Sequence, residues 1–364
     1  MIYLVAGEAS GDLHGSNLIK AMLAINPDLE LRFCGGDLMQ AAGGTLVQHY
    51  KNRAFMGFTE VIKNLGTIRK AIKEVQKDII ASKPEKIVLI DNPGFNMRIA
   101  KFAHKHGIPV HYYIAPKVWA WNTGRVKKLK ALVKKLYSIL PFEPAFFAKH
   151  GLKVEYVGNP VIDAIRHTEM QRPHEIPLGK KVVALLPGSR PPEIEKMLPV
   201  MLEVADKNLD LLFVIAVAPN FNLNDFKQYE KDNVIAIKDK TYNILSAAQA
   251  AIVTSGTATL ETAVLGVPQL VCYRVSGLTY AIGKQLIKVP YISLVNLILN
   301  KPAVKELIQD ECNATKINEE LLRLLSPVGA AQTKADYKQL EDLLGDKNAS
   351  EAVAMQILNN SKNK

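Results

Sequence analysis

The 364-residue sequence is poor in cysteine and has no long apolar run. Its three cysteines, Cys34, Cys272 and Cys312, stand far apart, and none belongs to a Cys-x-x-Cys pair. This spacing argues against a zinc site or a disulfide framework and fits a reducing compartment. The longest apolar runs, such as residues 211–218, are far too short to span a bilayer.

Several motifs of nucleotide and metal enzymes are also missing. No Asp-x-Asp occurs, which argues against the sugar-nucleotide fold that grips diphosphate through Mg²⁺, and no Gly-x-x-x-x-Gly-Lys-Ser/Thr loop is present. There is no His-Glu-x-x-His, and the eight histidines show no metal-ligand spacing. We therefore expect neither a metal nor another cofactor. The start of the sequence lacks a basic region followed by an apolar stretch, so we expect a cytoplasmic protein without a secretory signal.

Positive charge is abundant. Lys and Arg total 46 against 35 acidic residues, a net charge of +11. Such an excess favours contact with nucleic acid, anionic lipid headgroups or phosphorylated substrates, although it is also compatible with a merely basic surface. No nucleic-acid-binding module is recognisable, and the aromatic residues are not interleaved with the basic runs, so we do not expect nucleic acid as a partner.

Short β-branched runs alternate with longer amphipathic segments, a pattern typical of parallel sheets covered by helices. The runs in the first half of the chain are residues 2–6, 31–33, 87–90, 110–114, 136–140 and 154–157. After a polar, proline-containing stretch, the runs in the second half are residues 181–186, 211–217, 234–237, 251–253 and 269–273. From Pro302 onward the sequence predicts helices only.

This alternation predicts an α/β protein of two doubly wound, Rossmann-like domains that face a cleft. We place a first domain at residues 1–166, a linker at 167–180, a second domain at 181–345 and a C-terminal helix with a polar tail at 346–364. Ligands of such sheets bind at the carboxyl ends of the strands.

The first of these strand ends is residues 7–15, which lead into a helix. Glycines there let backbone N–H groups approach an anionic or sugar ligand, but the spacing is not Gly-x-Gly-x-x-Gly. An ordinary βα turn is the alternative. Four polar residues favour a substrate site: Glu8, Ser10, Asp12 and His14.

Asp91 directly follows the apolar run 87–90 and should face the cleft. A partly desolvated carboxylate has a raised pKa and can accept a proton from a substrate hydroxyl. A helix cap or an Asx-turn residue before Pro93 is an equally good interpretation of the local sequence.

The second half has two further strand ends with anion-binding features. Gly188, Ser189 and Arg190 form a turn before a helix that starts with proline, which suits a diphosphate, unless Arg190 serves a structural ion pair.

Ser255, Gly256 and Thr257 form the other turn. We expect Ser255 or Thr257 to cap the following helix and Gly256 to bare backbone amides toward a phosphate. One turn further on, Glu261 can accept hydrogen bonds from a ribose diol, or it can be an ordinary solvated helix residue.

Two segments have the pattern of lipid-contacting helices, although core packing explains each of them as well. Residues 55–68 carry an apolar stripe, and residues 125–136 combine an apolar stripe with five lysines. A basic amphipathic helix suits an anionic membrane surface.

The order of the motifs resembles the bacterial lipid-A-disaccharide synthase family along nearly the whole chain. The motifs that carry the resemblance are AGEASGD at 6–12, MGFTEV at 56–61, DNPGFN at 91–96, PKVWAW at 116–121, LPFE at 140–143, LPGSR at 186–190, SGTATLE at 255–261 and SLVN at 293–296. The resemblance implies a GT-B glycosyltransferase whose first domain binds the lipid acceptor and whose second domain binds UDP. It also implies an essential Asp91, a nucleotide-binding Arg190 and a site residue at Asn296.

The implied reaction joins UDP-2,3-diacylglucosamine to 2,3-diacylglucosamine 1-phosphate and gives a β-1,6-linked disaccharide and UDP, as a step of lipid A biosynthesis. The alternative is another GT-B enzyme of UDP-N-acetylglucosamine, such as the peptidoglycan lipid transferase or a 2-epimerase. We also expect an anionic membrane surface as a partner. The enzyme would work as a peripheral protein on the inner face of that membrane. Whether the chain forms a homodimer is left open.

Overall fold

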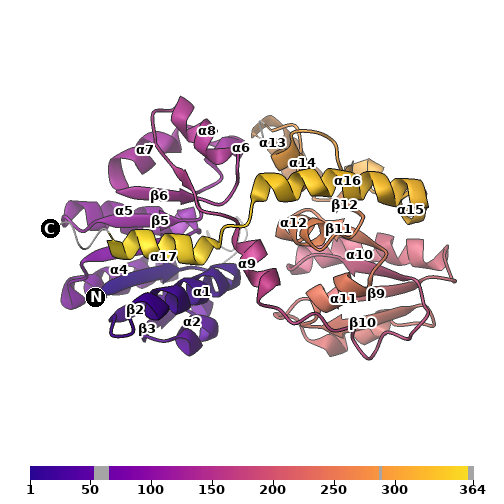
Figure 1. Cartoon of the computed structure of the whole chain (residues 1–364), viewed down its shortest axis with the longest axis horizontal. Coiled ribbons are helices and arrows are strands. Elements are labelled where there is room, and N and C mark those ends of the chain that lie inside the picture. Colours follow the sequence, from indigo (N-terminus) through magenta and orange to yellow (C-terminus); the bar gives the residue numbers. More distant parts are fainter. Residues whose placement is uncertain (53–64, 287–288, 360–364) are drawn as a thin grey trace. The chain divides into compact units, whose positions relative to one another are not determined.

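A computed structural model describes residues 1–52, 65–286 and 289–359, and the chain divides into two compact α/β units. The first unit comprises Met1–Asp163 together with Asp346–Lys364, and the second comprises Ala164–Gly345. The last helix, α17 (Ala349–Asn359), therefore belongs to the first unit, where it contacts α1 (Ala9–Ile25), as Figure 1 shows.

Seven parallel strands form the sheet of the first unit, in the order β3-β2-β1-β4-β5-β6-β7. They are β1 (Ile2–Ala6), β2 (Leu31–Gly35), β3 (Thr45–His49), β4 (Lys86–Ile90), β5 (Val110–Tyr113), β6 (Lys135–Ser138) and β7 (Glu155–Tyr156). The other helices of this part of the chain are α2 (Asp37–Ala42), α4 (Leu65–Ser82), α5 (Pro93–Lys105), α6 (Val118–Trp121), α7 (Arg125–Leu132), α8 (Glu143–Lys149) and, across the boundary, α9 (Pro160–Arg166), with the 3-10 turn η1 (Tyr50–Asn52).

The central strands are continuously apolar because helices cover both faces of this sheet. Along β1, Tyr3 and Val5 pack on the face covered by α4 and α5. Ile2 and Leu4 pack on the other face, with α1 and α17. Successive side chains of a strand point to opposite faces, so one apolar run fills two cores.

The second unit has a six-stranded parallel sheet in the order β10-β9-β8-β11-β12-β13. Its strands are β8 (Val182–Leu186), β9 (Leu212–Val217), β10 (Val234–Lys238), β11 (Ala250–Thr254), β12 (Gln269–Tyr273) and β13 (Lys305–Ile308). Its helices are α10 (Pro191–Asp206), α11 (Thr241–Ala247), α12 (Thr257–Val264), α13 (Gly277–Leu286), α14 (Leu294–Leu299), α15 (Ala314–Leu325) and α16 (Pro327–Leu344), with the 3-10 turns η2 (Leu223–Tyr229) and η3 (Gln309–Glu311).

Three local predictions from the sequence are wrong. A strand, β13, lies in the C-terminal region where only helices are expected, and it pairs with β12. The helix expected over residues 125–136 ends at Leu132, because Leu136 is a buried residue of β6. The polar turn expected at residues 7–15 is short, because α1 already begins at Ala9. Of the apolar segment predicted at 55–68, residues 55–64 lie outside the described residues, and residues 65–68 begin α4.

The segment 167–180 has no helix or strand, but it lies against the second unit. Asn243 donates from its side-chain amide to the carbonyl oxygens of Glu169 and Gln171, at 3.1 and 2.8 Å. Lys240 forms an ion pair with Glu175 at 3.0 Å, and the side chain of Ile176 is buried in the core of this unit.

Candidate functional site

The candidate base lies where the sheet of the first unit changes direction. From β1 the chain continues to β2 on one side, whereas from β4 it continues to β5 on the other, so the carboxyl ends of β1 and β4 flank the switch point. Ala6 and Ile90 are partners in the register of these two strands. Gly7 and Asp91 therefore begin the two turns that flank the crevice where ligands of such sheets bind.

The turn after β4 is strained. Asp91 and Asn92 both adopt left-handed backbone conformations, with φ of 46° and 41°. Such conformations cost about 1–3 kcal/mol for a residue other than glycine, and they cluster at functional sites. Three hydrogen bonds hold the backbone of Asp91 itself. Its N–H donates to Tyr113 O at 3.0 Å, and its carbonyl accepts from Tyr112 Oη at 2.6 Å and from Asn96 Nδ2 at 2.8 Å.

Gly7 lets the two turns touch. A methyl group at this position would overlap the side-chain amide of Asn92. Glycine is therefore required for close approach here, and the sequence motif around Gly7 has a packing reason that its spacing alone did not reveal.

The environment of Asp91 prepares its carboxylate to take a proton. Burial raises the pKa of Asp91 to about 6, and the nearby carboxylate of Glu8 adds to this rise. The charge of Lys117 and a hydrogen bond from the N–H of Asn92 oppose it. A carboxylate that titrates at about 6 is ionised at neutral pH and holds a proton more firmly than an exposed one, as a general base requires.

The four polar residues predicted as a substrate site at the end of β1 differ in burial and in hydrogen bonding. Ser10 donates to Glu8 Oε1 at 3.2 Å, and both residues are accessible. His14 lies one helical turn beyond Ser10, and burial lowers its pKa to about 4, so it is a neutral imidazole. Its Nδ1 is buried without a hydrogen-bond partner among the described residues.

The carboxylate of Asp12 is bound by the fold. Its carboxylate accepts hydrogen bonds from the backbone N–H groups of Gly36, Leu38 and Met39, at 2.7, 3.1 and 3.1 Å, and its side chain is buried. Asp12 therefore holds the N-terminus of α2, a structural role, and its contact with a substrate stays a prediction.

Two residues that the motifs contain but that were not predicted as site residues complete this region. Lys117 follows the end of β5, and its charge acts on Asp91. Glu143 is buried and accepts hydrogen bonds from Trp119 Nε1 at 3.0 Å and from the N–H groups of Leu140 and Ile139 at 3.1 and 3.2 Å. Burial raises the pKa of Glu143 to about 7.

In the second unit the switch point lies between β8 and β11. Leu186 and Val253 are partners there, so the turns that follow them begin at the same edge of the sheet. These are the turns that contain Arg190 and Ser255, the two predicted anion sites. The topology therefore brings the two sites together within one unit.

The turn after β8 differs from its prediction. The first two residues of α10 are Pro191 and Pro192, which have no N–H to offer an anion. Glu193 brings its own carboxylate to this helix start, where it accepts from the N–H of Ser189 at 3.0 Å. The helix start is therefore not an open anion site, and the guanidinium of Arg190 is the cation that this turn presents. Its side chain is 57% exposed and pairs with Glu193 at 3.4 Å.

Gly188 is nevertheless required in this turn. It has a φ of 120°, and a methyl group there would lie 2.5 Å from a carboxylate oxygen of Glu193.

The turn after β11 fits an anion better. Neither Ser255 nor Thr257 caps α12, contrary to the prediction, because Ser255 Oγ donates to Ile292 O at 2.9 Å and no side chain caps this helix. Gly256 and Thr257 are exposed. The uncapped N–H groups leave this helix start open to an anionic group. Thr254 Oγ1, just before the turn, is buried and has no partner among the described residues.

Glu261 lies one turn into α12 and accepts a hydrogen bond from Tyr242 Oη at 2.8 Å. Burial raises the pKa of Glu261, and the hydrogen bond from Tyr242 opposes that rise. It is therefore not a solvated helix residue, and its second carboxylate oxygen can accept a further hydrogen bond.

Asn296 has a structural position instead of an open one. Its side-chain amide donates to Val304 O and to Glu306 Oε1, both at 2.8 Å, and its Oδ1 accepts from Val304 N at 2.9 Å. Only 1% of the residue is exposed. Asn296 thus fastens α14 to Val304 and to Glu306 of β13, and its role toward the substrate stays a prediction.

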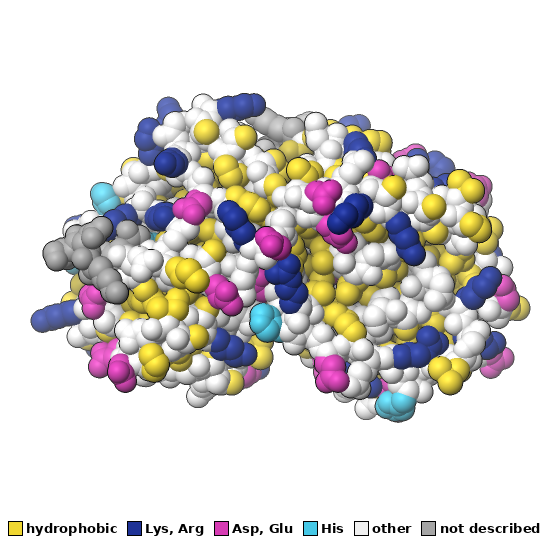
Figure 2. All heavy atoms as spheres, in the orientation of Figure 1, with side chains coloured by type: hydrophobic (Ala, Val, Ile, Leu, Met, Phe, Trp, Pro, Cys, Tyr) yellow, Lys and Arg dark blue, Asp and Glu magenta, His cyan; other side chains and the backbone are white. Residues whose placement is uncertain are grey.

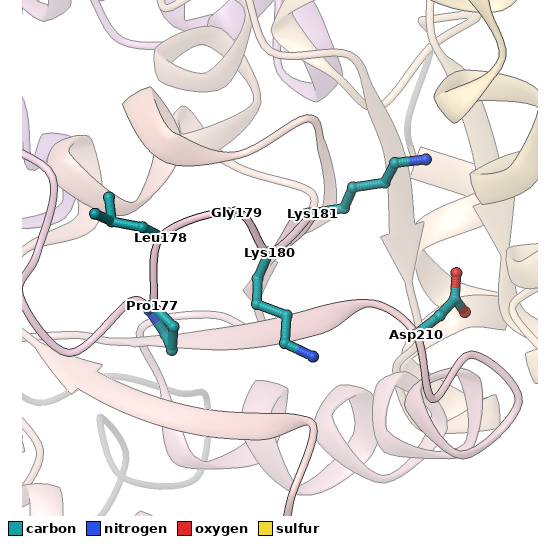
Figure 3. Close-up of a pocket in the computed structure, with 6 residues that line it drawn as sticks. All are labelled: Pro177, Leu178, Gly179, Lys180, Lys181 and Asp210. Carbon is teal, nitrogen blue, oxygen red and sulfur yellow. The ribbon is translucent and has the colours of Figure 1, made fainter.

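Two hollows in the described surface lie away from these strand ends. One has a volume of about 510 Å³ and lies before β8 and β9, at the amino ends of these strands (Figure 3). It is lined by Pro177, Leu178, Gly179, Lys180, Lys181 and Asp210. Another, of about 320 Å³, lies between β7 and the start of α17. Neither contains a predicted site residue.

Among the described residues, no three side chains of His, Cys, Asp or Glu come together as ligands for a metal ion. In the same part of the chain, no helix combines the length and apolar character needed to cross a membrane.

Comparisons with known proteins place this geometry in a family. The family model described as lipid-A-disaccharide synthetase matches residues 2–358. The lipid-A-disaccharide synthase of Geobacter metallireducens is 39% identical over 98% of this chain and 96% of its own length. That of Syntrophus aciditrophicus is 38% identical over 98% of this chain and 97% of its own length.

Solved structures show the same fold at low sequence identity. The UDP-GlcNAc 2-epimerase of Neisseria meningitidis, bound to UDP-GlcNAc, matches with a TM-score of 0.62 at 15% identity, over 99% of this chain and all of the other. A spinosyn rhamnosyltransferase in complex with its aglycone matches with a TM-score of 0.64 at 14% identity, over 99% of this chain and all of the other. These likenesses support the GT-B fold, and the matched family model and the closer relatives show that the chain belongs to the lipid-A-disaccharide synthase family of glycosyltransferases.

Proposed function

We propose that this enzyme condenses UDP-2,3-diacylglucosamine with 2,3-diacylglucosamine 1-phosphate. The products are the β-1,6-linked disaccharide 1-phosphate and UDP, which makes the reaction a step of lipid A biosynthesis. Membership of the family supports the reaction. The observation that carries the mechanism is Asp91, a carboxylate with a pKa raised to about 6 at the switch point of the first sheet.

Asp91 is the general base. A primary sugar hydroxyl is a weak nucleophile at neutral pH, so its proton has to move to a nearby acceptor as it attacks. The acceptor's C6 oxygen forms a bond to the anomeric carbon of the donor, and its proton passes to Asp91. The bond from that carbon to the diphosphate oxygen breaks, and UDP leaves with the electron pair. Attack from the face opposite the leaving group inverts the anomeric centre.

Glu8, Ser10 and His14 orient the acceptor beside Asp91. Glu8 and Ser10 are accessible and already joined by a hydrogen bond, and the neutral His14 can accept or donate one. Glu8 is also the next candidate for the base, because it lies close enough to act on the pKa of Asp91.

The second unit binds UDP and stabilises its negative charge. The open start of α12 at Ser255, Gly256 and Thr257 offers backbone N–H groups to the diphosphate, and the guanidinium of Arg190 adds a fixed positive charge. Gly188 and Ser189 shape the turn that carries Arg190. Glu261 accepts a hydrogen bond from the ribose diol. Charge stabilisation by such preorganised groups requires no metal ion.

The alternative enzymes of UDP-N-acetylglucosamine are less well supported. The 2-epimerase likeness has 15% identity and concerns the fold alone. Relatives that match almost the whole chain at 38–39% identity are lipid-A-disaccharide synthases.

We also propose that the protein works on the cytoplasmic face of the membrane, held by charge and not by insertion. On α7 the apolar residues Val126 and Leu129 are buried in the core, whereas the exposed lysines are Lys127, Lys128, Lys130 and, just after the helix, Lys134. Figure 2 shows Lys and Arg side chains gathered over α7 and α8 on the face in view. Each lysine near an anionic surface contributes about 1 kcal/mol, and salt screens the attraction.

Mass spectrometry tests the reaction directly. Incubation of the enzyme with synthetic UDP-2,3-diacylglucosamine and the monosaccharide 1-phosphate should give a product with the mass of the disaccharide 1-phosphate and an equal amount of UDP. Release of UDP without the disaccharide, or isomerisation of the donor, would refute the proposal. Sedimentation with anionic vesicles tests the membrane contact, which should weaken as salt rises and when the four lysines are replaced by glutamine.

A further inference from the structure

Two cations of the first unit, one beside Asp91 and one beside Tyr112, have no function assigned above. Lys117 follows β5, the neighbour of β4, and Ile90 and Tyr113 are partners in their register. Residues 114–117 therefore leave the same edge of the sheet as Asp91. Lys117 is exposed, and its charge opposes the burial that raises the pKa of Asp91 and of Glu143.

Arg125, at the start of α7, is the second cation. Its guanidinium carbon lies 4.7 Å from the centre of the Trp121 ring, a contact that holds the charged group in place. Arg125 is also close enough to Tyr112 to oppose the rise that burial causes in the pKa of that phenol. Tyr112 in turn donates to the carbonyl of Asp91 at 2.6 Å.

The segment 117–125, which carries both cations, is anchored by a buried side chain. Trp119 lies between Lys117 and Trp121 in the sequence, is buried, and donates to the buried carboxylate of Glu143 at 3.0 Å. Glu143 itself accepts two backbone N–H groups. A rigid support of this kind keeps neighbouring side chains, here Lys117 and Arg125, in a fixed geometry.

Neither cation has a carboxylate partner in the described part of the chain. Other cations of the same unit do: Arg32 pairs with Asp78 at 2.7 Å, and Lys135 pairs with Glu155 at 3.2 Å. Two cations without a carboxylate partner, one acting on Asp91 and one on the Tyr112 that holds its backbone, are suited to an anionic part of the substrate.

We infer that Lys117 and Arg125 form the subsite for the phosphate group of the acceptor. This inference rests on the proposed function. The acceptor brings a phosphate to a place that already holds the carboxylates of Glu8 and Asp91, and like charges repel unless cations intervene. The diphosphate of the donor has the same chemistry, but the acceptor is the sugar whose hydroxyl has to reach Asp91, and both cations belong to the unit that contains Asp91.

The test compares two acceptors, 2,3-diacylglucosamine 1-phosphate and the same sugar without phosphate. The wild-type enzyme should prefer the phosphorylated one. In the variants Lys117→Gln and Arg125→Gln we expect KM for the phosphorylated acceptor to rise about 10–100-fold, the range for one charge-assisted hydrogen bond. At pH 8, where Asp91 stays ionised even without the charge of Lys117, kcat and the KM for the acceptor without phosphate should change little, so that the preference disappears. Lys105→Gln, an exposed lysine at the far end of α5, is the matched control and should keep the preference.

Three results would overturn the inference. A variant that keeps the wild-type preference shows that the phosphate lies elsewhere. A loss of UDP affinity in calorimetry, with the preference intact, shows that the cations serve the donor. An equal loss with both acceptors, together with a lower unfolding midpoint, shows a structural role. If the wild-type enzyme makes no disaccharide from either acceptor, the proposed function fails by itself. Calorimetry of diacylglucosamine 1-phosphate binding to the wild type and to the two variants then still decides whether Lys117 and Arg125 bind this phosphate.

Discussion

Replacement of Asp91 by asparagine separates catalysis from folding in this enzyme. Asparagine has the shape of aspartate and tolerates the left-handed backbone that residue 91 adopts, so the turn after β4 should persist. It cannot take a proton from the acceptor hydroxyl. Loss of a general base typically lowers the rate by about 10²–10⁴-fold. We expect a loss of this size in kcat, with UDP affinity unchanged, because the UDP-binding residues belong to the other unit.

The same substitution should stabilise the fold at neutral pH. The pKa of Asp91 is raised in the folded protein from 3.8 to about 6 by burial. The folded state therefore binds the proton more tightly than the unfolded chain does, and this contribution to stability is full below about pH 4 and lost as pH rises through about 6. At pH 7 the ionised, partly buried carboxylate destabilises the native state by up to about 3 kcal/mol, and asparagine removes this effect.

Two measurements check these expectations. Urea denaturation from pH 4 to pH 8 should show the loss of stability with rising pH in the wild type and a weaker dependence in Asp91→Asn. In the wild type, kcat/KM should fall as pH drops below about 6, because the base becomes protonated. Near-normal turnover of a folded Asp91→Asn enzyme would refute the assignment of the base. Glu8→Gln is the companion variant: it removes a charge that raises the pKa of Asp91, so the acid limb of the profile should move to lower pH while turnover remains.

Three further substitutions or treatments test the remaining site residues. Arg190→Ala should weaken UDP binding about 10–100-fold in calorimetry, the loss of one charge-assisted contact, with little change in stability because its ion pair with Glu193 is largely exposed; unchanged UDP affinity would contradict the assignment. Asp12→Ala should lower the free energy of unfolding by at least about 2 kcal/mol, because three backbone N–H groups lose their acceptor. Ser10→Ala, at an exposed position, should be nearly neutral. Equal unfolding midpoints of the two variants in urea would show that Asp12 does not hold α2. Activity should persist in EDTA, because the sequence has no Asp-x-Asp and the start of α12 with Arg190 can neutralise the leaving diphosphate; a loss that Mg²⁺ restores would contradict this.

The central strands of both sheets could be predicted because their physical cause is local. A strand buried on both faces has to be mostly apolar. β1 and β8 are apolar throughout, and β4 and β11 are apolar except for Lys86 and Thr254 at one end of each. The strands that were missed lie at the edges of their sheets. β3 has the sequence TLVQH and β13 has KELI, in which polar and charged residues interrupt the apolar pattern because one side of an edge strand faces solvent.

The positions of candidate site residues after strands could be predicted from the sequence. The role of each residue, structural or ligand-binding, could not be predicted in this way. Asp12 binds the N–H groups of residues 36–39, and Asn296 is held by Val304 and Glu306, in bonds that depend on how distant segments pack. Glu193 is a nearer case: the sequence shows that it follows two prolines, but not that its carboxylate folds back onto Ser189. A polar residue in a motif therefore indicates that a position is constrained, and only its partners show whether a ligand or the fold imposes the constraint.

The turn at Asp91 shows how both constraints can meet at one residue. Its backbone is held by Tyr112 and Tyr113 of β5 and by Asn96 of α5, while Gly7 at the end of β1 leaves room for Asn92. Three elements thus maintain two left-handed residues in succession, although Asp and Asn usually adopt this conformation singly. None of these supporting contacts uses the carboxylate of Asp91, which interacts instead with the charges of Glu8 and Lys117. The fold fixes the backbone and leaves the carboxylate to the chemistry, and for this reason substitution of that side chain should affect turnover far more than structure.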